Sequence, residues 1–287
     1  MIHSITHSIS QVTAWSVLLL VALQVVSQLM VNLQWYLIAR QAGTGISFAD
    51  MLRVNCQGAL ADSVTPGVKF GGEVARAVQL SRVGGCSGED AAAIVALQKM
   101  FSIGGMLAVV LLVLLVLAGL SGGLHRADFR FEAAVPAGVI AAAVLLAGLL
   151  LLPRVRRRVR SFGRVLRGHI AGLRGRPGFS AALAALSLAI WMLYPVKMYA
   201  VCVQFLPDVG LMSVGAVAFV SYTVAMLPIF PGGLGGFEAS MSAMLVSLGF
   251  ALSDAAVITV IFRFVTFWLV MLLSLVYIGV MRCVVKH

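Results

Sequence analysis

The sequence predicts an all-α integral membrane bundle, with about five full spans plus two re-entrant helical hairpins in an inverted pseudo-repeat. Of the 287 residues, 61% are hydrophobic and 11% are charged. This composition and the mean hydropathy of +1.04 lie far outside the range of soluble globular domains. Long uncharged runs approach the roughly 20 residues that a helix needs to cross about 30 Å of hydrocarbon. We therefore treat residues 1–287 as a single membrane domain, with full spans expected near 11–39, 92–120, 133–152, 178–206 and 255–281.

The basic residues are concentrated between two of these spans. The formal net charge is +11, and nine of the 21 Lys and Arg residues lie within 154–176. Short Arg-rich segments mark the cytoplasmic side of a membrane and are attracted to anionic lipid. We interpret 154–176 as a basic cytoplasmic loop between a first half, 1–153, and a second half, 177–287. A specific lipid or partner site in this loop is the alternative, and no nucleic-acid partner is expected.

The same charge pattern sets the expected topology. With the loop inside, the chain is a multi-pass protein of the cell (plasma) membrane, with its N-terminus outside and its C-terminus cytoplasmic. Residues near 48–82 then start and finish on the cytoplasmic side, and residues near 209–254 start and finish outside. Proline and glycine interrupt both segments, and broken helices at membrane depth are tolerated only where protein or water covers them. We predict one re-entrant hairpin in each half, entering from opposite faces.

The breaks in the two hairpins share a sequence pattern. Residues 66–73 read PGVKFGGE and residues 231–238 read PGGLGGFE, so both fit PGxxxGxE. Proline ends the incoming helix, and glycine allows a tight turn and close approach of a ligand. A second helix then begins near each glutamate, and its N-terminus presents backbone N–H groups that suit phosphate or carboxylate. The recurrence of this pattern at both hairpins predicts an inverted structural repeat.

These motifs predict a substrate-binding site, because ionisable groups inside a membrane are costly and usually functional. The predicted substrate-binding residues are Lys69, Gly71, Gly72, Glu73, Arg76, Lys197, Pro231, Gly232, Gly233, Gly235, Gly236, Glu238 and Arg263. In the alternative interpretation, Glu73 and Glu238 only cap their helices, and Arg263 and Lys197 form a buried ion pair with Glu238 that only fixes packing. The four cysteines form no CxxC pair and no soluble-enzyme motif is present, so we expect no catalytic residue, metal or cofactor.

At these motifs the chain resembles the lysylphosphatidylglycerol synthetase transmembrane (flippase-like) domain family, as a stand-alone member without the synthase module. The resemblance covers essentially the whole chain and is most specific in 66–82, in 228–240 and at Arg263. After the first hairpin the family often has Glu-Arg followed by Asp, whereas this sequence has Gln98 and Lys99 followed by Met100. The resemblance implies a flippase or transporter that moves an (aminoacyl-)phospholipid or a polyprenyl-linked or glycolipid between leaflets.

Two other functions follow from the same residues and the same resemblance. One is a membrane component of lysylphosphatidylglycerol synthesis, an intramembrane lipid transferase with Glu238 or Glu73 as base, for which the family label is phosphatidylglycerol lysyltransferase. The other is a membrane anchor subunit for a separate lipid-modifying enzyme, held through the 154–176 loop. The expected partners are an anionic phospholipid or lipid-linked substrate and a separate synthase or glycosyltransferase.

Overall fold

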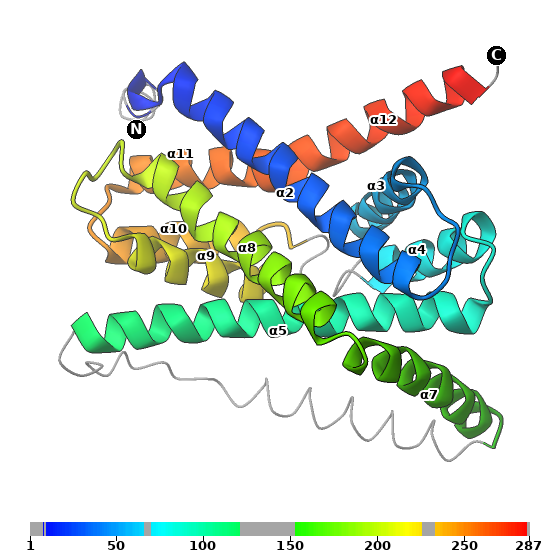
Figure 1. Ribbon diagram of the computed structural model, residues 1–287. Helices are drawn as coiled ribbons and strands as arrows, with labels where there is room; N and C mark the ends of the chain where they lie inside the picture. The colour runs from blue at the N-terminus through cyan, green and yellow to red at the C-terminus, as the bar shows by residue number, and fades with distance from the viewer. Residues whose placement is uncertain (1–7, 9, 66–69, 121–152, 226–232, 286–287) are drawn as a thin grey trace.

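The computed structural model describes residue 8 and residues 10–65, 70–120, 153–225 and 233–285 (Figure 1). These residues form an all-α bundle. Its helices are α2 (Ala14–Gln41), α3 (Phe48–Val64), α4 (Phe70–Val83), α5 (Gly88–Leu120), α7 (Pro153–Arg174), α8 (Pro177–Cys202), α9 (Leu211–Ala225), α10 (Gly236–Ser247), α11 (Leu252–Arg263), the π-helical turn η1 (Phe264–Trp268) and α12 (Leu269–Val285).

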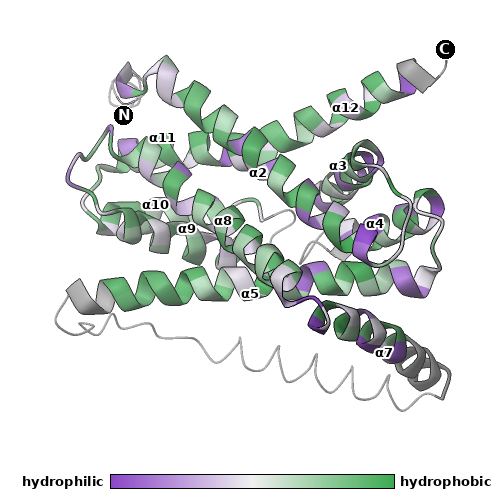
Figure 2. Cartoon of the chain, viewed as in Figure 1, coloured by the Kyte–Doolittle hydropathy of each residue, from purple (hydrophilic) through white to green (hydrophobic). Residues whose placement is uncertain are grey.

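Four stretches of the described chain are long and apolar enough to cross a membrane. They are Ala14–Gln41, Gly88–Val116, Pro177–Cys202 and Leu252–Cys283, and they match four of the five predicted spans. The expected span at 133–152 lies outside the described residues. In Figure 2, hydrophobic residues dominate these long helices, whereas hydrophilic residues gather on α3, α4 and α7. The apolar lengths therefore make this a multi-pass membrane protein.

The last span contains a π-helical turn that the sequence did not predict. Helix α11 ends at Arg263, the five residues of η1 follow, and α12 continues the same run. A π-turn holds an extra residue within a helical turn and is often found at functional sites. Arg263 therefore sits immediately before a local irregularity in an otherwise continuous helix.

Two helical hairpins occupy opposite parts of the long helix α5. Helix α4 packs on the N-terminal part of α5, where Leu80 meets Ile94 and Leu97. Helix α9 packs on its C-terminal part, where Phe219 meets Val109 and Val113. The hairpin α3–α4 corresponds to the predicted segment 48–82, and α9–α10 lies within the predicted segment 209–254. At 1.5 Å per residue these four helices are roughly 18 to 26 Å long, shorter than the hydrocarbon core of a bilayer.

Polar contacts tie the helix ends together at two opposite ends of the bundle. At one end, Ser8 Oγ donates to Asp254 at the start of α11, and Thr13 N–H donates to Gln204 just after α8. At the other end, Arg176 before α8 donates to Gln41, the last residue of α2, and Tyr277 of α12 donates to the Ala49 carbonyl of α3. The first hairpin is therefore attached at one end of the bundle, and the second is linked to helices at the other.

The segment predicted as a basic loop forms the amphipathic helix α7. Residues 154–174 contain no proline, and their many arginines are good helix formers, which outweigh the glycines at 163, 168 and 172. Its apolar residues at positions 166, 170 and 173 recur at helical spacing and pack on α5. Between 164 and 174 its arginines stay exposed.

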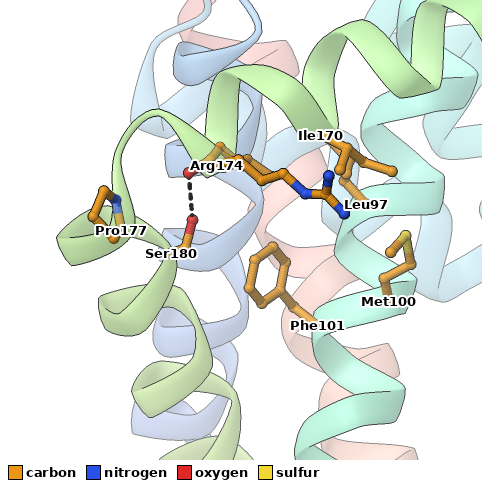
Figure 3. Close-up of a pocket in the computed structure, with 8 residues that line it drawn as sticks. Leu97, Met100, Phe101, Ile170, Arg174, Pro177 and Ser180 are labelled. Carbon is orange, nitrogen blue, oxygen red and sulfur yellow. Dashed lines mark hydrogen bonds between the residues drawn. The ribbon is translucent and has the colours of Figure 1, made fainter.

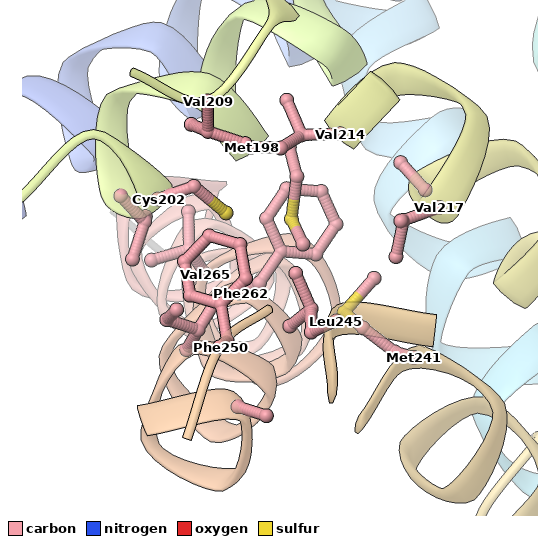
Figure 4. Close-up of a cluster of buried hydrophobic side chains, with 14 of the residues drawn as sticks. Met198, Cys202, Val209, Val214, Val217, Met241, Leu245, Phe250, Phe262 and Val265 are labelled. Atoms are coloured by element: carbon pink, nitrogen blue, oxygen red, sulfur yellow. The ribbon is translucent and has the colours of Figure 1, made fainter. Parts of the chain in front are cut away.

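The largest hydrophobic cluster holds the second hairpin against α8 and α11 (Figure 4). Met198 and Cys202 of α8 meet Val214 and Val217 of α9 and Phe262 of α11, and all five are buried. Met241 and Leu245 of α10 close the cluster. This packing positions the first turn of α10, and with it Glu238, against the end of α11.

Candidate functional site

The first hairpin carries a four-residue charge cluster at the start of α4. Arg76 Nη1 lies 2.9 Å from Glu73 Oε1 and 3.2 Å from Asp62 Oδ2. Lys99 Nζ of α5 lies 2.7 Å from the same Glu73 oxygen. Two carboxylates and two cations therefore balance each other, and all but Lys99 have largely buried side chains. Balanced pairing of this kind is what a partly buried charge cluster requires.

Small residues allow these charges to approach the backbone closely. The N–H of Gly72 donates to Asp62 Oδ1 at 3.1 Å, so α3 supplies a carboxylate to the N-terminus of α4. A Cβ at Gly72 would overlap the Asp62 carboxylate, and one at Gly58 would overlap the Arg76 side chain. The carboxylate at the start of α4 is also favoured by the helix dipole.

In the second hairpin, Glu238 both caps α10 and pairs with a cation. Its Oε2 accepts from the N–H of Gly235 at 2.7 Å, and its Oε1 lies 3.1 Å from Arg263 Nε. Gly235 and Gly233 have φ of +84° and +73°, a region that favours glycine. Glu238 therefore both caps its helix and forms an ion pair with Arg263.

Arg263 is held between aromatic rings at the end of α11. Its Cζ lies 4.8 Å from the ring centroid of Phe237 and 4.4 Å from that of Phe267, which is part of η1. The side chain is 7% exposed, against 31% for Glu238. Ring faces attract a guanidinium and limit its rotation. Arg263 is thus held by Glu238, Phe237 and Phe267, whereas the side chain of Glu238 stays partly exposed.

Lys197 is fully buried on α8 and takes its hydrogen-bond acceptors from α2. Nζ donates to Gln24 Oε1 at 2.7 Å and to Ser27 Oγ at 3.1 Å, and it lies 4.5 Å from the ring centroid of Tyr194. The alternative in which Lys197 and Arg263 both pair with Glu238 therefore holds for Arg263 alone. A lysine whose acceptors here are neutral amide and hydroxyl oxygens is unusual in a buried position.

A row of aromatic rings lies between Lys197 and Arg263. Tyr194 contacts Tyr222 at a centroid distance of 5.0 Å, and Tyr222 contacts Phe237 at 5.1 Å. Phe237 in turn lies under Arg263. These rings come from α8, α9 and α10 and separate the two cations. Lys197 and Arg263 therefore lie in distinct surroundings.

The first hairpin lies farther along α2. Arg76 Cζ is 5.7 Å from the ring centroid of Trp35, eight residues after Ser27. At 1.5 Å per residue this places the environments of Arg76 and Lys197 about 12 Å apart along the helix. The buried polar face of α2, which includes Asn32 and Gln34, runs between them. Helix α2 thus links the two environments, a role that its apolar composition did not suggest.

The structure describes most, but not all, of the predicted site residues. Lys69, Pro231 and Gly232 lie outside the described residues. Gly71 and Gly72 lie in the first turn of α4, Gly235 precedes α10, and Gly236 is the first residue of α10. The N–H groups of Gly72 and Gly235, predicted to face a phosphate, here donate to carboxylates of the protein itself.

Two residues outside the predicted set belong to the charge clusters. Asp62 interrupts an otherwise moderately apolar limb of the first hairpin, and Lys99 follows Glu73 by 26 residues. Arg263 follows Glu238 by 25 residues, so each hairpin glutamate pairs with a cation on the next long helix. This near-equal spacing is the sequence signal that identifies Lys99 as the counterpart of Arg263.

Several buried acceptors around the first hairpin have no hydrogen-bond partner within the described chain. They include Oε2 of Glu73, Oε1 of Gln98 and Oδ1 of Asn55. Gln98 donates through Nε2 to Gln34 at 3.1 Å, and Asn55 donates through Nδ2 to Asn32 at 2.8 Å. Open acceptors of this kind suit a ligand with hydroxyl or amine donors.

The sequence of this chain matches that of a known protein family. Residues 2–274 match the family model described as "Lysylphosphatidylglycerol synthase TM region". Two matches to proteins described as "UPF0104 membrane protein", both from Methanothermobacter thermautotrophicus (strain Delta H), are 26% identical over 117 and 114 residues. They cover 41% and 39% of this chain and 35% and 34% of the relatives, so the chain matches about a third of the relatives' length. No solved structure matches the chain significantly.

Proposed function

This chain belongs to the lysylphosphatidylglycerol synthase TM-region family, and from that premise we propose that it moves a lipid between the two leaflets of a membrane. The candidate cargo is an (aminoacyl-)phospholipid or a polyprenyl-linked or glycolipid. The observation that carries the proposal is the repeated ion pair: Glu73 of the first hairpin with Lys99 of α5, and Glu238 of the second hairpin with Arg263 of α11. Charged groups placed on broken helices inside a membrane bundle are typical of transport pathways.

The proposed mechanism exchanges protein ion pairs for contacts with the lipid head group. A phosphate competes with the glutamate for Lys99 or Arg263, while an amine or hydroxyl of the head group donates to the released carboxylate. Both Lys99 and Glu238 are partly exposed, at 40% and 31% of their side chains, so each pair has one member within reach of an incoming head group. The acyl chains stay in the bilayer, and the two hairpins expose the site to alternate sides.

The proposal includes the inverted repeat and the topology. The two hairpins are short, attach near opposite ends of the bundle and pack on opposite parts of α5. We propose that both are re-entrant, that α7 and the C-terminus are cytoplasmic, and that the N-terminus is outside. The Arg-rich sequence of α7 supports this orientation. Cysteine accessibility on spheroplasts, with single cysteines at Asp208 and Arg167, tests it: reagent outside the cell should label only the first.

Leaflet exchange in liposomes tests the transport function. Purified protein is reconstituted with fluorescent phosphatidylglycerol, and dithionite reports the fraction of label that reaches the outer leaflet over time. Wild type should accelerate exchange over protein-free liposomes. Glu238→Gln and Arg263→Ala should each slow it, by about 10- to 100-fold if one charge-assisted contact worth about 1.5 to 3 kcal/mol is lost in the transition state.

Matched controls separate the site from the general charge of the protein. Asp208→Asn removes an exposed carboxylate after α8, and Arg82→Ala removes an exposed arginine at the end of α4. Both should leave exchange unchanged. Wild-type rates in Glu238→Gln and Arg263→Ala would remove the proposed site. Absence of exchange by wild type with phosphatidylglycerol, lysyl-phosphatidylglycerol, a glycolipid and a polyprenyl phosphate would remove the function.

A second candidate function rests on the family description itself. The matching model is named for lysylphosphatidylglycerol synthase, which supports a role as a membrane component of that synthesis. Mass spectrometry of lipids from cells with and without the gene distinguishes the two. Synthesis changes the total amount of a lipid species, whereas transport changes only its distribution between leaflets.

A further inference from the structure

The helix α7 covers a cavity that lies outside the ion-pair sites. The cavity has a volume of about 520 Å³ and is lined by α5, α7 and α8 (Figure 3). Its lining residues are Leu97, Met100, Phe101, Ile170, Leu173, Arg174, Pro177 and Ser180. The volume falls within the range of small-molecule sites in proteins. The lining is apolar apart from Arg174 and Ser180, so it suits an occupant that is largely apolar and carries one anionic group.

Arg174 is the charged group of this cavity. Figure 3 shows its side chain extending over the opening, with the guanidinium near Leu97 and Ile170. The residue is exposed, so an anion can reach its five N–H donors. Ser180 is less available, because its hydroxyl donates to the Leu173 carbonyl at 2.9 Å. An arginine pairs well with phosphate, and the apolar lining beneath it can accommodate an acyl chain.

The contacts and composition of α7 favour a position at a membrane surface for this cavity. Two contacts dock the helix at the ends of spans: His169 lies 3.2 Å from Asp90 in the first turn of α5, and Arg176, just after α7, donates to Gln41 at the end of α2. The helix is amphipathic, its sequence holds no acidic residue, and its arginines at 164 and 167 are exposed. An amphipathic basic helix docked at the ends of spans lies in the interface and attracts anionic lipid.

We propose that the cavity between α5, α7 and α8 binds one anionic phospholipid of the adjacent leaflet, with an acyl chain against Leu97 and Phe101 and the phosphate on Arg174. This site is separate from the proposed transport function and does not depend on it. The apolar lining favours a phospholipid over a free phosphate, because phosphate alone would leave that lining unoccupied. A zwitterionic lipid would not use the excess positive charge of α7.

Native mass spectrometry of the detergent-purified protein tests the proposal. Protein is incubated with phosphatidylglycerol or with phosphatidylcholine of the same acyl chains, and the retained adducts are counted. Wild type should retain phosphatidylglycerol preferentially. Arg174→Gln should weaken retention about fivefold, the effect of one basic residue beside an anionic group. Arg167→Gln is the matched control: it removes the same charge from α7 but keeps the arginine of the cavity, so it should weaken retention less than Arg174→Gln does.

A second variant tests the apolar half of the site without changing charge. Met100 lines the cavity and is 53% exposed, so Met100→Trp can narrow the cavity with little risk to folding. It should also reduce retention, while unchanged thermal stability without added lipid shows that the bundle is intact. Equal retention of both lipids, or equal loss in Arg174→Gln and Arg167→Gln, would overturn the proposal. Unchanged retention in Met100→Trp, or binding of inorganic phosphate alone with the same Arg174 dependence, would do so as well.

Discussion

Lys99 Nζ lies 2.7 Å from Glu73 Oε1, which places a cation of α5 on the first turn of α4. The same relationship recurs in the second half, where Arg263 Nε lies 3.1 Å from Glu238 Oε1. The two pairs differ in their surroundings. Glu73 also pairs with Arg76, and Lys99 is 40% exposed, whereas Arg263 is 7% exposed and enclosed by aromatic rings. Lys99 and Arg263 therefore occupy corresponding positions, but Arg263 is the more deeply buried cation and should contribute more to the stability of the fold.

This difference predicts unequal effects on stability when each cation is removed. Arg263→Leu leaves Glu238 without its buried partner and should lower the free energy of unfolding by about 2 kcal/mol. Lys99→Leu should cost less than about 1 kcal/mol, because Arg76 still pairs with Glu73 and the lost pair is partly solvated. Thermal unfolding in detergent measures both. The double variant Glu238→Gln/Arg263→Leu should recover part of the loss, and an additive loss would show that the two residues do not interact.

The close approach of α3 to α4 predicts that Gly72 cannot be replaced. In Gly72→Ala the new methyl would meet the Asp62 carboxylate, and the shift needed to accommodate it should cost about 1 to 3 kcal/mol. Gly104→Ala is the control, because a Cβ at that helical position meets nothing within 4 Å and should be neutral or stabilise by about 0.5 to 1 kcal/mol. Melting temperatures of the two variants provide the comparison. Equal melting temperatures would mean that Asp62 does not cap α4.

Replacing Lys197 should slow transport without lowering the stability of the protein. Lys197→Met has nearly the same volume and removes a buried charge whose hydrogen-bond acceptors, Gln24 and Ser27, are neutral, so the melting temperature should stay the same or rise. If the charge contacts a lipid phosphate during transport, leaflet exchange should fall about 10- to 100-fold. Ser27→Ala keeps the cation and removes one acceptor, so exchange should persist. Wild-type exchange in Lys197→Met would remove Lys197 from the site.

The π-turn predicts which single-residue deletion the last span tolerates. Deleting Thr266 converts the turn to regular helix and leaves α11 and α12 facing the same way, because the π-turn holds one residue more than an α-turn. Deleting Leu273 from regular α12 should instead rotate everything after it by about 100° and disrupt packing. Yield and size-exclusion profile compare the two proteins. Loss of the folded protein in both deletions would show that η1 itself is required for the fold.

The sequence was sufficient to predict most elements of the fold. Apolar length alone located the spans at α2, α5, α8 and α11–α12, since the hydrocarbon thickness imposes that length. Proline and glycine located both hairpins within a few residues, because they end helices. The helix α7 was predicted as a loop because its charge density concealed the helical spacing of its apolar residues.

The candidate site was only partly predictable. Sequence pattern selected Glu73, Glu238 and Arg263 as ionisable groups within apolar surroundings. It did not indicate that Asp62 would cap α4 or that Lys99 would reach Glu73, because these contacts join different helices. It also placed Lys197 with the other cations, although its acceptors come from α2.

By itself the sequence determined the membrane environment, the approximate spans, the positions of the hairpin helices and the ionisable residues that lie in apolar surroundings. These features depend on local composition, which each segment of chain carries with it. Only the tertiary structure decided the partners: which carboxylate faces which cation, that aromatic rings separate Lys197 from Arg263, and that Arg174 opens onto an apolar cavity. Pairing depends on how helices distant in sequence pack, and helix packing is set by the shapes of many side chains at once.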